Sequence, residues 1–355
     1  MTAFDPKRAT WSVQATVNEP LELLVAFVAH YLELGADVIY LYLDAPHPEA
    51  EAAFSSHPRV KVTICDDVYW AKLTPKGRPS VVPARQKWNS RHVYSQINTD
   101  WLLLCDADEY LVAGCDLGEL LGRQPIKTEY LRIRVAEKIL EPDVEATSIF
   151  DGIFRTAQQK GASLALEIYG RELAPMLERI VAGHDIGKSI IRRGLDCVLG
   201  IHQPKRRTIP IGSSQSVQDL QWTWMPEAYI AHFDALTPLY YLVKLLARHL
   251  IMQSIQDTGR QPNPIHHRSR EAQMLFAVAA CATKDPAAVT AALHRPTREQ
   301  MAALSRHGLV VDLNINPVAL TAKHFPALRL DFSPAAFDSA LRLRHAQTLA
   351  RMGVT

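Results

Sequence analysis

The stretch Trp101-Leu102-Leu103-Leu104-Cys105-Asp106-Ala107-Asp108-Glu109-Tyr110-Leu111-Val112 decides how this chain folds. Its apolar run ends abruptly in three carboxylates and then resumes, which predicts a buried strand with Asp106 and Asp108 at its carboxyl end. Two carboxylates one residue apart at such a strand end can both reach a divalent cation, and that cation can bridge two phosphate oxygens. An Asp-x-Asp pair alone is a weak motif, but the preceding strand and the adjacent Glu109 favour a metal-holding site.

The composition sets the broad class of the protein. A chain of 355 residues suggests about two domains, and 48% hydrophobic with 21% charged residues is typical of a globular protein with a substantial core. The net charge of +2 argues against a nucleic-acid partner. No apolar run approaches the roughly 20 residues of a membrane-spanning helix, and no signal-peptide core is apparent at the start. The five scattered cysteines predict free thiols in a reducing cytoplasm.

The first third of the chain alternates strand-like and helix-like segments. Strands are predicted at 11–17, 38–43, 60–64 and 101–105, with intervening helices at 20–34, 48–55 and 84–97. This order predicts right-handed crossovers and a mostly parallel sheet, in which ligands bind beyond the carboxyl ends of the strands. The acidic residues at such ends are Asp44, Asp66, Asp67, Asp106 and Asp108. The alternative, that these residues only form turns and helix caps, weighs most for Asp66 and Asp67.

The rest of the chain predicts further strands and then a helical region. Strands are expected at 129–135, 189–192, 196–202 and 228–232, with the middle two paired around Arg193-Gly194. A long helix is expected from Thr237 to about Gln256, followed by a Pro- and Gly-containing segment and several helix-start signals. The predicted domains are residues 10–256 and a helical C-terminal region, 265–355.

Two further side chains are candidates for the same site. His232 follows a predicted strand and could be a third ligand beside the Asp pair, since imidazole is a common ligand of Mn-type ions; the alternative is a structural histidine. Lys188 lies in a segment that formally fits a loose P-loop, but the predicted order of helix before and strand after is the reverse of a true P-loop. Lys188 therefore either contacts a phosphate as a single cation or is an exposed lysine in a glycine turn.

Several segments, in this order, resemble bacterial family 2 and family 92-type glycosyltransferases. The resemblance covers roughly residues 10–250, and its most specific part is the Asp-x-Asp-Glu core with the preceding Asp100-Trp101. The turn after the second strand departs from the family pattern, and residues 151–181 match it poorly. The segments that carry the resemblance are Asn18-Glu19, His30 to Ala36, Arg85-Gln86, Asp100 to Val112, Gly187 to Arg192, Gly200 to His202, His232-Phe233 and Lys244.

The resemblance implies a GT-A fold, an α/β sheet flanked by helices, here with a C-terminal helical extension. It implies a hexosyltransferase-type enzyme that uses Mn²⁺ or Mg²⁺, with Asp106, Asp108 and His232 as metal ligands. The donor would be a nucleotide sugar, and the acceptor a saccharide or a lipid-linked saccharide in cell-surface polysaccharide synthesis. A cytoplasmic protein, peripheral at the inner membrane, would suit such an acceptor. The donor-binding candidates are Asn18, Glu19, Asp44, Asp66, Arg85, Gln86 and Lys188, and the base candidates, chosen by placement alone, are Asp151 and Asp185.

Two other functions stay open at this point. A nucleotidyltransferase could use a similar sheet and Asp pair, but it would normally carry a Gly-rich phosphate loop after the first strand, and Thr16-Val17-Asn18-Glu19-Pro20 contains no glycine. A non-catalytic module that binds a sugar or a partner is the third hypothesis. It predicts that ligand binding survives the loss of both Asp106 and Asp108.

Overall fold

The computed structural model describes residues 8–158, 163–206, 219–257, 268–285 and 287–354. They form two compact units, and each draws on several segments of the chain. The first unit comprises the described residues of Met1–Arg134, Ile186–Ile230 and Ala319–Leu328. The second comprises Val135–Asp185, Ala231–Val318 and Arg329–Thr355. The predicted division into residues 10–256 and 265–355 stays a prediction, and much of the predicted linker lies outside the described residues.

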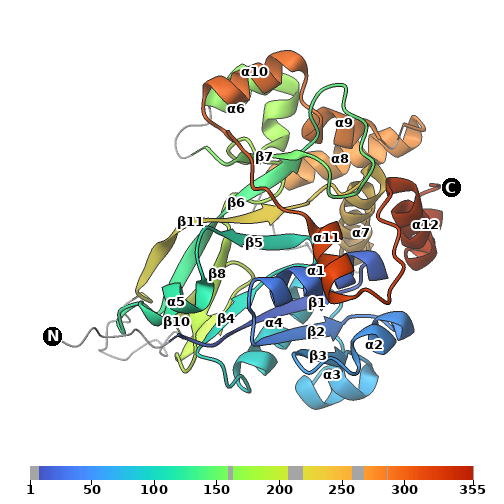
Figure 1. The fold of residues 1–355 in the computed structure, drawn as a ribbon. Coiled ribbons are helices and arrows are strands. Elements are labelled where there is room, and N and C mark those ends of the chain that lie inside the picture. The colour runs from blue at the N-terminus through green and yellow to red at the C-terminus, as the bar shows by residue number, and fades with distance from the viewer. Residues whose placement is uncertain (1–7, 159–162, 207–218, 258–267, 286, 355) are drawn as a thin grey trace, which may run out of the picture. The chain divides into compact units, whose positions relative to one another are not determined.

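The first unit is an α/β sheet flanked by helices (Figure 1), which confirms the predicted fold class. Its strands lie in the order β6-β8-β4-β1-β2-β3. Strands β4, β1, β2 and β3 are parallel, and β8 lies antiparallel between β4 and β6. The arrangement is consistent with a GT-A-like fold. The elements are β1 Trp11–Val17, α1 Leu21–Glu33, β2 Val38–Leu43, α2 Pro48–Phe54, β3 Val60–Ile64, α3 Asp67–Leu73, α4 Val82–Tyr94, β4 Trp101–Leu104, β5 Glu109–Ala113, α5 Leu117–Gly122, β6 Tyr130–Ile139, β8 Lys188–Arg192, β9 Cys197–Leu199, β10 Pro204–Arg206 and β11 Trp222–His232.

The alternation of β1 explains how the sheet is covered on both faces. Successive side chains of a strand point to opposite faces. Trp11 contacts Tyr31 of α1 edge to face, with ring centroids 6.3 Å apart. On the other face Gln14 accepts a hydrogen bond from Ser90 of α4 at 3.1 Å. The strand is buried along its whole length, so its polar residues are satisfied by the protein rather than by water. Thr16 accepts a hydrogen bond from Asn89 of α4 at 3.0 Å, and Ser12 Oγ lies 2.8 Å from Thr99 Oγ1.

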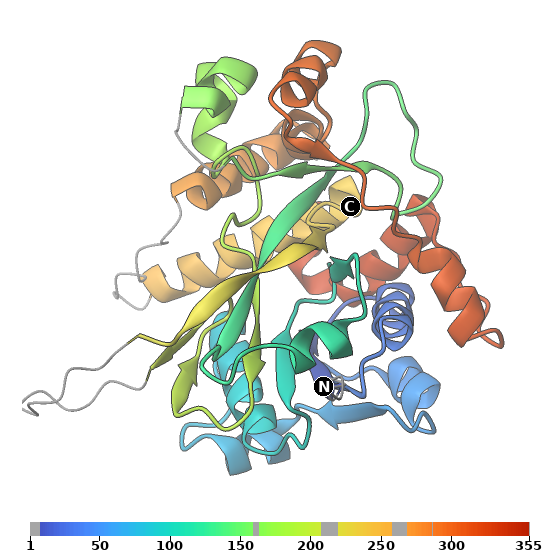
Figure 2. The same ribbon diagram turned by 60° about the vertical axis from the view of Figure 1, so that its left-hand side comes forward.

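The second unit consists mainly of helices around one apolar cluster. Helices α7, α8 and α9 pack together, and α7 and α8 lie side by side in Figure 2. Tyr241 and Leu245 of α7 meet Met274 and Ala277 of α8 in this cluster. The elements are β7 Ile153–Thr156, α6 Ser163–Leu173, the 3-10 turn η1 Ala174–Met176, α7 Pro238–Asp257, α8 Arg268–Ala282, α9 Ala288–His294, α10 Arg298–Arg306, β12 Val310–Val311, α11 Pro317–His324, α12 Pro334–Arg344 and α13 Ala346–Arg351. Strands β6 and β11 begin in the first unit and continue into the second, and α11 runs from the second into the first.

One predicted strand pairing is wrong. The segments at 189–192 and 196–202 were expected to pair with each other around Arg193-Gly194. In the structure β8 pairs with β4 on one edge and β6 on the other, so it has no free edge for β9. Strand β9 pairs with β10 instead.

Among the described helices, none combines the length and apolar character needed to cross a membrane.

Candidate functional site

The predicted Asp-x-Asp-Glu segment forms a tight turn directly after β4. The backbone N–H of Glu109 donates to the carbonyl of Asp106 at 3.1 Å, and the backbone N–H of Asp106 donates to Glu109 Oε2 at 2.9 Å. Glu109 is fully buried, whereas a third of the Asp106 side chain is exposed. The turn therefore presents Asp106 to solvent at the carboxyl edge of the parallel strands and fixes it with a buried carboxylate.

Lys188 joins this turn from the start of β8. Its Nζ lies 2.8 Å from Asp106 Oδ2 and 2.8 Å from Glu109 Oε2, and its side chain is buried. Burial alone would lower the pKa of Lys188, but the carboxylates of Asp106 and Glu109 outweigh it and raise that pKa above its ordinary value. Lys188 is thus a permanent cation beside Asp106, and the alternative of an exposed lysine in a glycine turn is wrong.

Gly187 is what allows Lys188 to reach this position. Its φ is +76°, and a Cβ there would lie 1.9 Å from the carbonyl oxygen of Ile133. Only glycine fits a left-handed backbone pressed against a neighbouring strand in this way. Glycine at position 187 is therefore required by the local geometry of the sheet.

Helix α4 supplies the second contact of Asp106. Gln86 Nε2 donates to Asp106 Oδ1 at 2.6 Å. The preceding Arg85 anchors the start of α4. Its Nε lies 2.8 Å from Asp44 Oδ1. Its Nη1 donates to the carbonyls of Pro79 and Ser80 at 2.9 Å. Asp44 also pairs with Arg78 at 2.9 Å. Arg85 and Asp44, predicted separately as donor-binding residues, therefore bind each other and position Gln86.

The remaining donor candidates of the first unit differ in their surroundings. Asp66 caps α3, accepting a hydrogen bond from the N–H of Tyr69 at 2.7 Å, which supports the alternative of a helix cap. Glu19 Oε2 accepts from the N–H of Asn18 at 2.7 Å. Burial raises the pKa of Tyr110, and the charges of Asp108 and Glu19 raise it further.

The donor set of this turn suits a divalent cation. Asp106, Asp108 and Glu109 supply hard carboxylate oxygens, the ligand type that Mg²⁺ and Mn²⁺ prefer. Three carboxylates against the one ammonium of Lys188 leave two formal negative charges at the strand end. Asp106 Oδ1 accepts a hydrogen bond from Gln86 and Oδ2 from Lys188, and an ionised carboxylate offers about four lone-pair sites in all. Lys188 pairs equally with Asp106 and Glu109, and the assignment of Asp106 and Asp108 as metal ligands stays a prediction.

The other three predicted site residues belong to the second unit, so their sharing a centre with Asp106 and Asp108 stays a prediction. His232 is buried; its Nε2 lies 3.6 Å from Asp234 Oδ1, and its ring centroid lies 5.2 Å from that of His184. Asp185 accepts a hydrogen bond from Arg179 at 2.9 Å. Burial raises the pKa of Asp151, but the hydrogen bonds from Ser148 and Thr147 outweigh this effect and lower it.

The second unit also contains a buried cluster of ionisable residues that the sequence did not indicate. Ligand atoms of Glu137, Asp234 and His294 lie within 4.8 Å of one another and could hold a divalent cation. His294 Nδ1 lies 3.4 Å from the carbonyl of Lys138, and the described residues give its buried Nε2 no hydrogen-bond partner. Burial lowers the pKa of His294 to about 4, so its imidazole is neutral.

Basic side chains already neutralise this cluster. Glu137 Oε2 lies 2.6 Å from Nη2 of the buried Arg155 and accepts a hydrogen bond from the N–H of Ala182 at 2.9 Å. Asp234 pairs with Lys244 and, at 3.4 Å, with Arg270. Two carboxylates thus face three cations, and a divalent metal would add to an existing excess of positive charge. The cluster is therefore a structural ion-pair network of the second unit.

Lys138 is a buried amine whose contacts predict a pH dependence of stability. Its Nζ donates to the carbonyls of Ile149 and Leu236 at 2.7 and 3.2 Å, and burial lowers its pKa to about 7, opposed by the charge of Asp151. In the unfolded chain the pKa of Lys138 is the ordinary 10.5. Between pH 7 and 10.5 the unfolded chain therefore carries a proton on Lys138 that the folded protein has lost. The contribution of Lys138 to stability should rise with pH through that window, by at most about 1.4 kcal/mol per pH unit.

The measurement is the free energy of urea unfolding of the wild type minus that of Lys138→Met at pH 7, 8 and 9. We expect this difference to become more favourable to the wild type at each step. A difference that is constant over the three pH values would show that Lys138 has an ordinary pKa in the folded protein.

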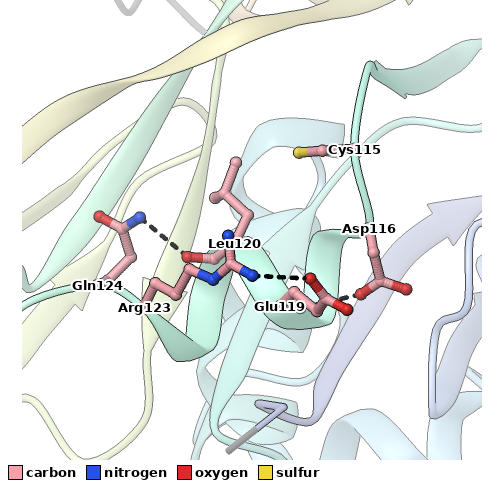
Figure 3. A pocket seen from close by; sticks show the side chains of 6 residues that line it. All are labelled: Cys115, Asp116, Glu119, Leu120, Arg123 and Gln124. Atoms are coloured by element: carbon pink, nitrogen blue, oxygen red, sulfur yellow. Dashed lines mark hydrogen bonds and ion pairs between the residues drawn. The ribbon is translucent and has the colours of Figure 1, made fainter. Parts of the chain in front are cut away.

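A surface depression of about 180 Å³ lies around α5 (Figure 3). Asp116 caps this helix by accepting a hydrogen bond from the N–H of Glu119 at 2.9 Å, and Arg123 pairs with Glu119 at 3.0 Å. Its charged groups thus pair among themselves at the surface, and it lacks the predicted site residues. The residues that line the depression are Cys115, Asp116, Glu119, Leu120, Arg123 and Gln124.

Comparisons with known proteins identify no family for this chain. No protein-family model matches it, and no curated protein matches its sequence. Among solved structures, HddC from Yersinia pseudotuberculosis is similar with a TM-score of 0.31 and 10% identity, covering 66% of this chain and 96% of that one. TarS 1-349 from S. aureus has a TM-score of 0.29 and 10% identity, covering 96% of this chain and 87% of that one. Overlaps this low carry no argument about activity.

Proposed function

We propose that this protein is a metal-dependent glycosyltransferase that moves a sugar from a nucleotide-sugar donor to a saccharide or lipid-linked saccharide acceptor. The observation that carries the proposal is the arrangement of Asp106. Its carboxylate stands at the carboxyl edge of the parallel strands, is partly exposed, and is held on one oxygen by Gln86 and on the other by Lys188. Edges of this kind are where α/β sheets bind their ligands.

Each residue of the cluster has a distinct role in this proposal. Asp106 and Asp108 hold Mn²⁺ or Mg²⁺, which when bound neutralises negative charge on the diphosphate leaving group. Lys188 fixes the orientation of Asp106 and adds a cation beside the phosphates. Gln86 fixes Asp106 from the other side, and Asp44 acts through Arg85 by anchoring α4. His232 would be the third metal ligand.

Asp151 and Asp185 remain the proposed bases for the acceptor hydroxyl. A base must be ionised and close to neutral in pKa to remove a proton efficiently. The lowered pKa of Asp151 keeps it ionised but makes it a weak base. Asp185 is half of an ion pair with Arg179, and its side chain is only 12% exposed. Because the base must lie beside the acceptor hydroxyl, the acceptor would bind next to whichever of Asp151 and Asp185 is the base.

The place of the reaction follows from the acceptor. Synthesis of a cell-surface polysaccharide would occur in the cytoplasm or at the inner membrane, with the protein peripheral to it.

A nucleotidyltransferase is not better supported, because the segment between β1 and α1 has no glycine-rich phosphate loop. A non-catalytic binding module differs from the proposal in a single outcome: its ligand binding would not depend on the Asp pair.

The proposal is tested by release of nucleoside diphosphate from a panel of UDP-, GDP- and ADP-sugars, with Mn²⁺, with Mg²⁺ and with EDTA. Glycosyltransferases often hydrolyse their donor slowly when no acceptor is present, because water takes the place of the acceptor hydroxyl. We expect release from one nucleotide class, its loss in EDTA and its recovery with added metal. Release that is equal with and without metal, or absent for every donor in folded protein, would contradict the proposal.

A further inference from the structure

A second group of side chains in the first unit forms a ladder of aromatic rings and guanidinium groups. Strand β11 pairs with β6, and the indoles of Trp222 and Trp224 extend from β11 beside Arg132 and Arg134 of β6. The Arg132 guanidinium lies 4.6 Å from the ring centroid of Trp222 and 4.5 Å from that of Trp224. Arg134 lies 4.8 Å from the Trp224 ring, and Tyr130 stacks on Trp222 at 6.2 Å. We call these five residues the tryptophan–arginine platform.

One end of the platform lies toward the sheet edge that carries the Asp106 turn. Strand β6 runs antiparallel to β8, and Ile133 pairs directly with Lys188. Arg132 and Arg134 flank Ile133 and, because side chains alternate along a strand, lie on the face opposite to Lys188. Neighbouring strands are about 4.8 Å apart. The Arg134 end of the platform is therefore nearest the carboxyl end of β4, whereas Tyr130 is level with Leu102 near the start of that strand. The platform is built from side chains that the Asp106 turn does not use.

We infer that the tryptophan–arginine platform binds a saccharide that carries carboxylate groups. The C–H groups on one face of a pyranose ring form an apolar surface that packs on an exposed indole, and Trp222 is 43% exposed. A guanidinium stacked on an indole keeps its N–H donors in its own plane, where they fit a carboxylate in bidentate fashion. A uronic acid presents both features, an apolar ring face and a carboxylate at its rim.

The charge balance of the platform favours an acidic occupant. Arg134 has no carboxylate partner in the part of the chain that the structure describes. A nearby acid, Glu129, is engaged by Arg206 at 2.9 Å and by the N–H of Gln221 at 2.7 Å. Among the described residues, the positive charge of Arg134 therefore contacts the Trp224 ring and no carboxylate. If the proposed transferase function holds, this acidic saccharide is its acceptor.

Binding to the platform can be measured without nucleotide or metal, so its outcome is independent of the proposed transfer activity. The probe is a hexamer of galacturonic acid, titrated into the full-length protein by calorimetry at physiological salt. Neutral cellohexaose and inorganic polyphosphate serve as comparison ligands, one lacking the charge and the other lacking the sugar ring. We expect binding of the galacturonate hexamer alone.

Two variants locate that binding. Arg134→Gln and Trp222→Ala should each weaken it at least about tenfold, which corresponds to about 1.4 kcal/mol. The matched control is Arg91→Gln, which removes another guanidinium stacked on an indole, that of Trp88 of α4 at 5.4 Å, and should leave affinity unchanged. If Trp222→Ala impairs folding, the affinity of Arg134→Gln for the galacturonate hexamer decides whether the platform is the binding site. No binding, equal binding of cellohexaose or polyphosphate, or equal affinity in Arg134→Gln would overturn the inference.

Discussion

Replacing Lys188 with methionine is expected to lower the free energy of unfolding by roughly 3–5 kcal/mol, because it leaves buried carboxylate charge without its partner. Lys188 has 1% of its side chain exposed and Glu109 none. Methionine keeps a similar length and apolar volume, so the effect reports the lost charge rather than a cavity. The measurement is equilibrium urea unfolding followed by circular dichroism, with wild type and variant compared at pH 7.

The chain offers a matched control in Lys323, which pairs with Glu33 at 2.8 Å but has 61% of its side chain exposed. Lys323→Met should change stability by less than about 1 kcal/mol, because exposed ion pairs contribute little. The double variant Lys188→Met/Glu109→Gln should recover part of the loss, since it also removes the unpaired charge. A loss below about 1 kcal/mol in Lys188→Met would contradict the buried pairing with Asp106 and Glu109.

Replacing Asp106 or Asp108 with asparagine should lower metal-dependent release of nucleoside diphosphate at least about a hundredfold. A metal that stabilises the leaving diphosphate contributes several kcal/mol, and each 1.36 kcal/mol is a factor of ten in rate. Asparagine has nearly the shape of aspartate but carries no charge, so it weakens the metal site with little change in packing. The measurement is the initial rate with saturating donor and Mn²⁺.

Asp116→Asn is the matched control for these variants. Asp116 is also an aspartate at the end of a loop, but it caps α5, and asparagine caps helices as well as aspartate does. We expect an unchanged rate for this variant. A rate in Asp106→Asn within a factor of three of the wild type, with the fold intact, would remove Asp106 from the proposed metal site.

The sequence predicted the first unit well because its signals are local. The four parallel strands each lie within one residue of their predicted bounds, since apolar runs bounded by turns identify them without long-range information. The predicted helix at 20–34 is observed as α1, and Gly35 ends it with a φ of +89°. Helix α3 was missed because its seven residues lie in a stretch read as a loop.

Pairings between distant segments could not be predicted in the same way. Asp44 and Arg85 are 41 residues apart and bind each other, yet each fits a donor-binding role when it is considered alone. Glu137 and Arg155 meet because β6 pairs with β7. The signal that could have drawn attention to them is Glu137-Lys138, two adjacent charged residues inside an otherwise apolar strand end. No local pattern predicts which residues pair with Glu137 and Lys138, because these pairs depend on which strands become neighbours in the sheet.

The most direct test of the proposed metal site is calorimetric titration of UDP, GDP and CMP, with and without Mn²⁺, into the wild type and the Asp106→Asn/Asp108→Asn variant. The proposal predicts that one nucleotide binds in the presence of Mn²⁺, that its affinity falls sharply without the metal, and that the double variant loses the metal-dependent part. Binding of a nucleotide that is unchanged in the folded double variant, or no metal-dependent binding by the wild type, would contradict the assignment of Asp106 and Asp108 as the donor-metal ligands.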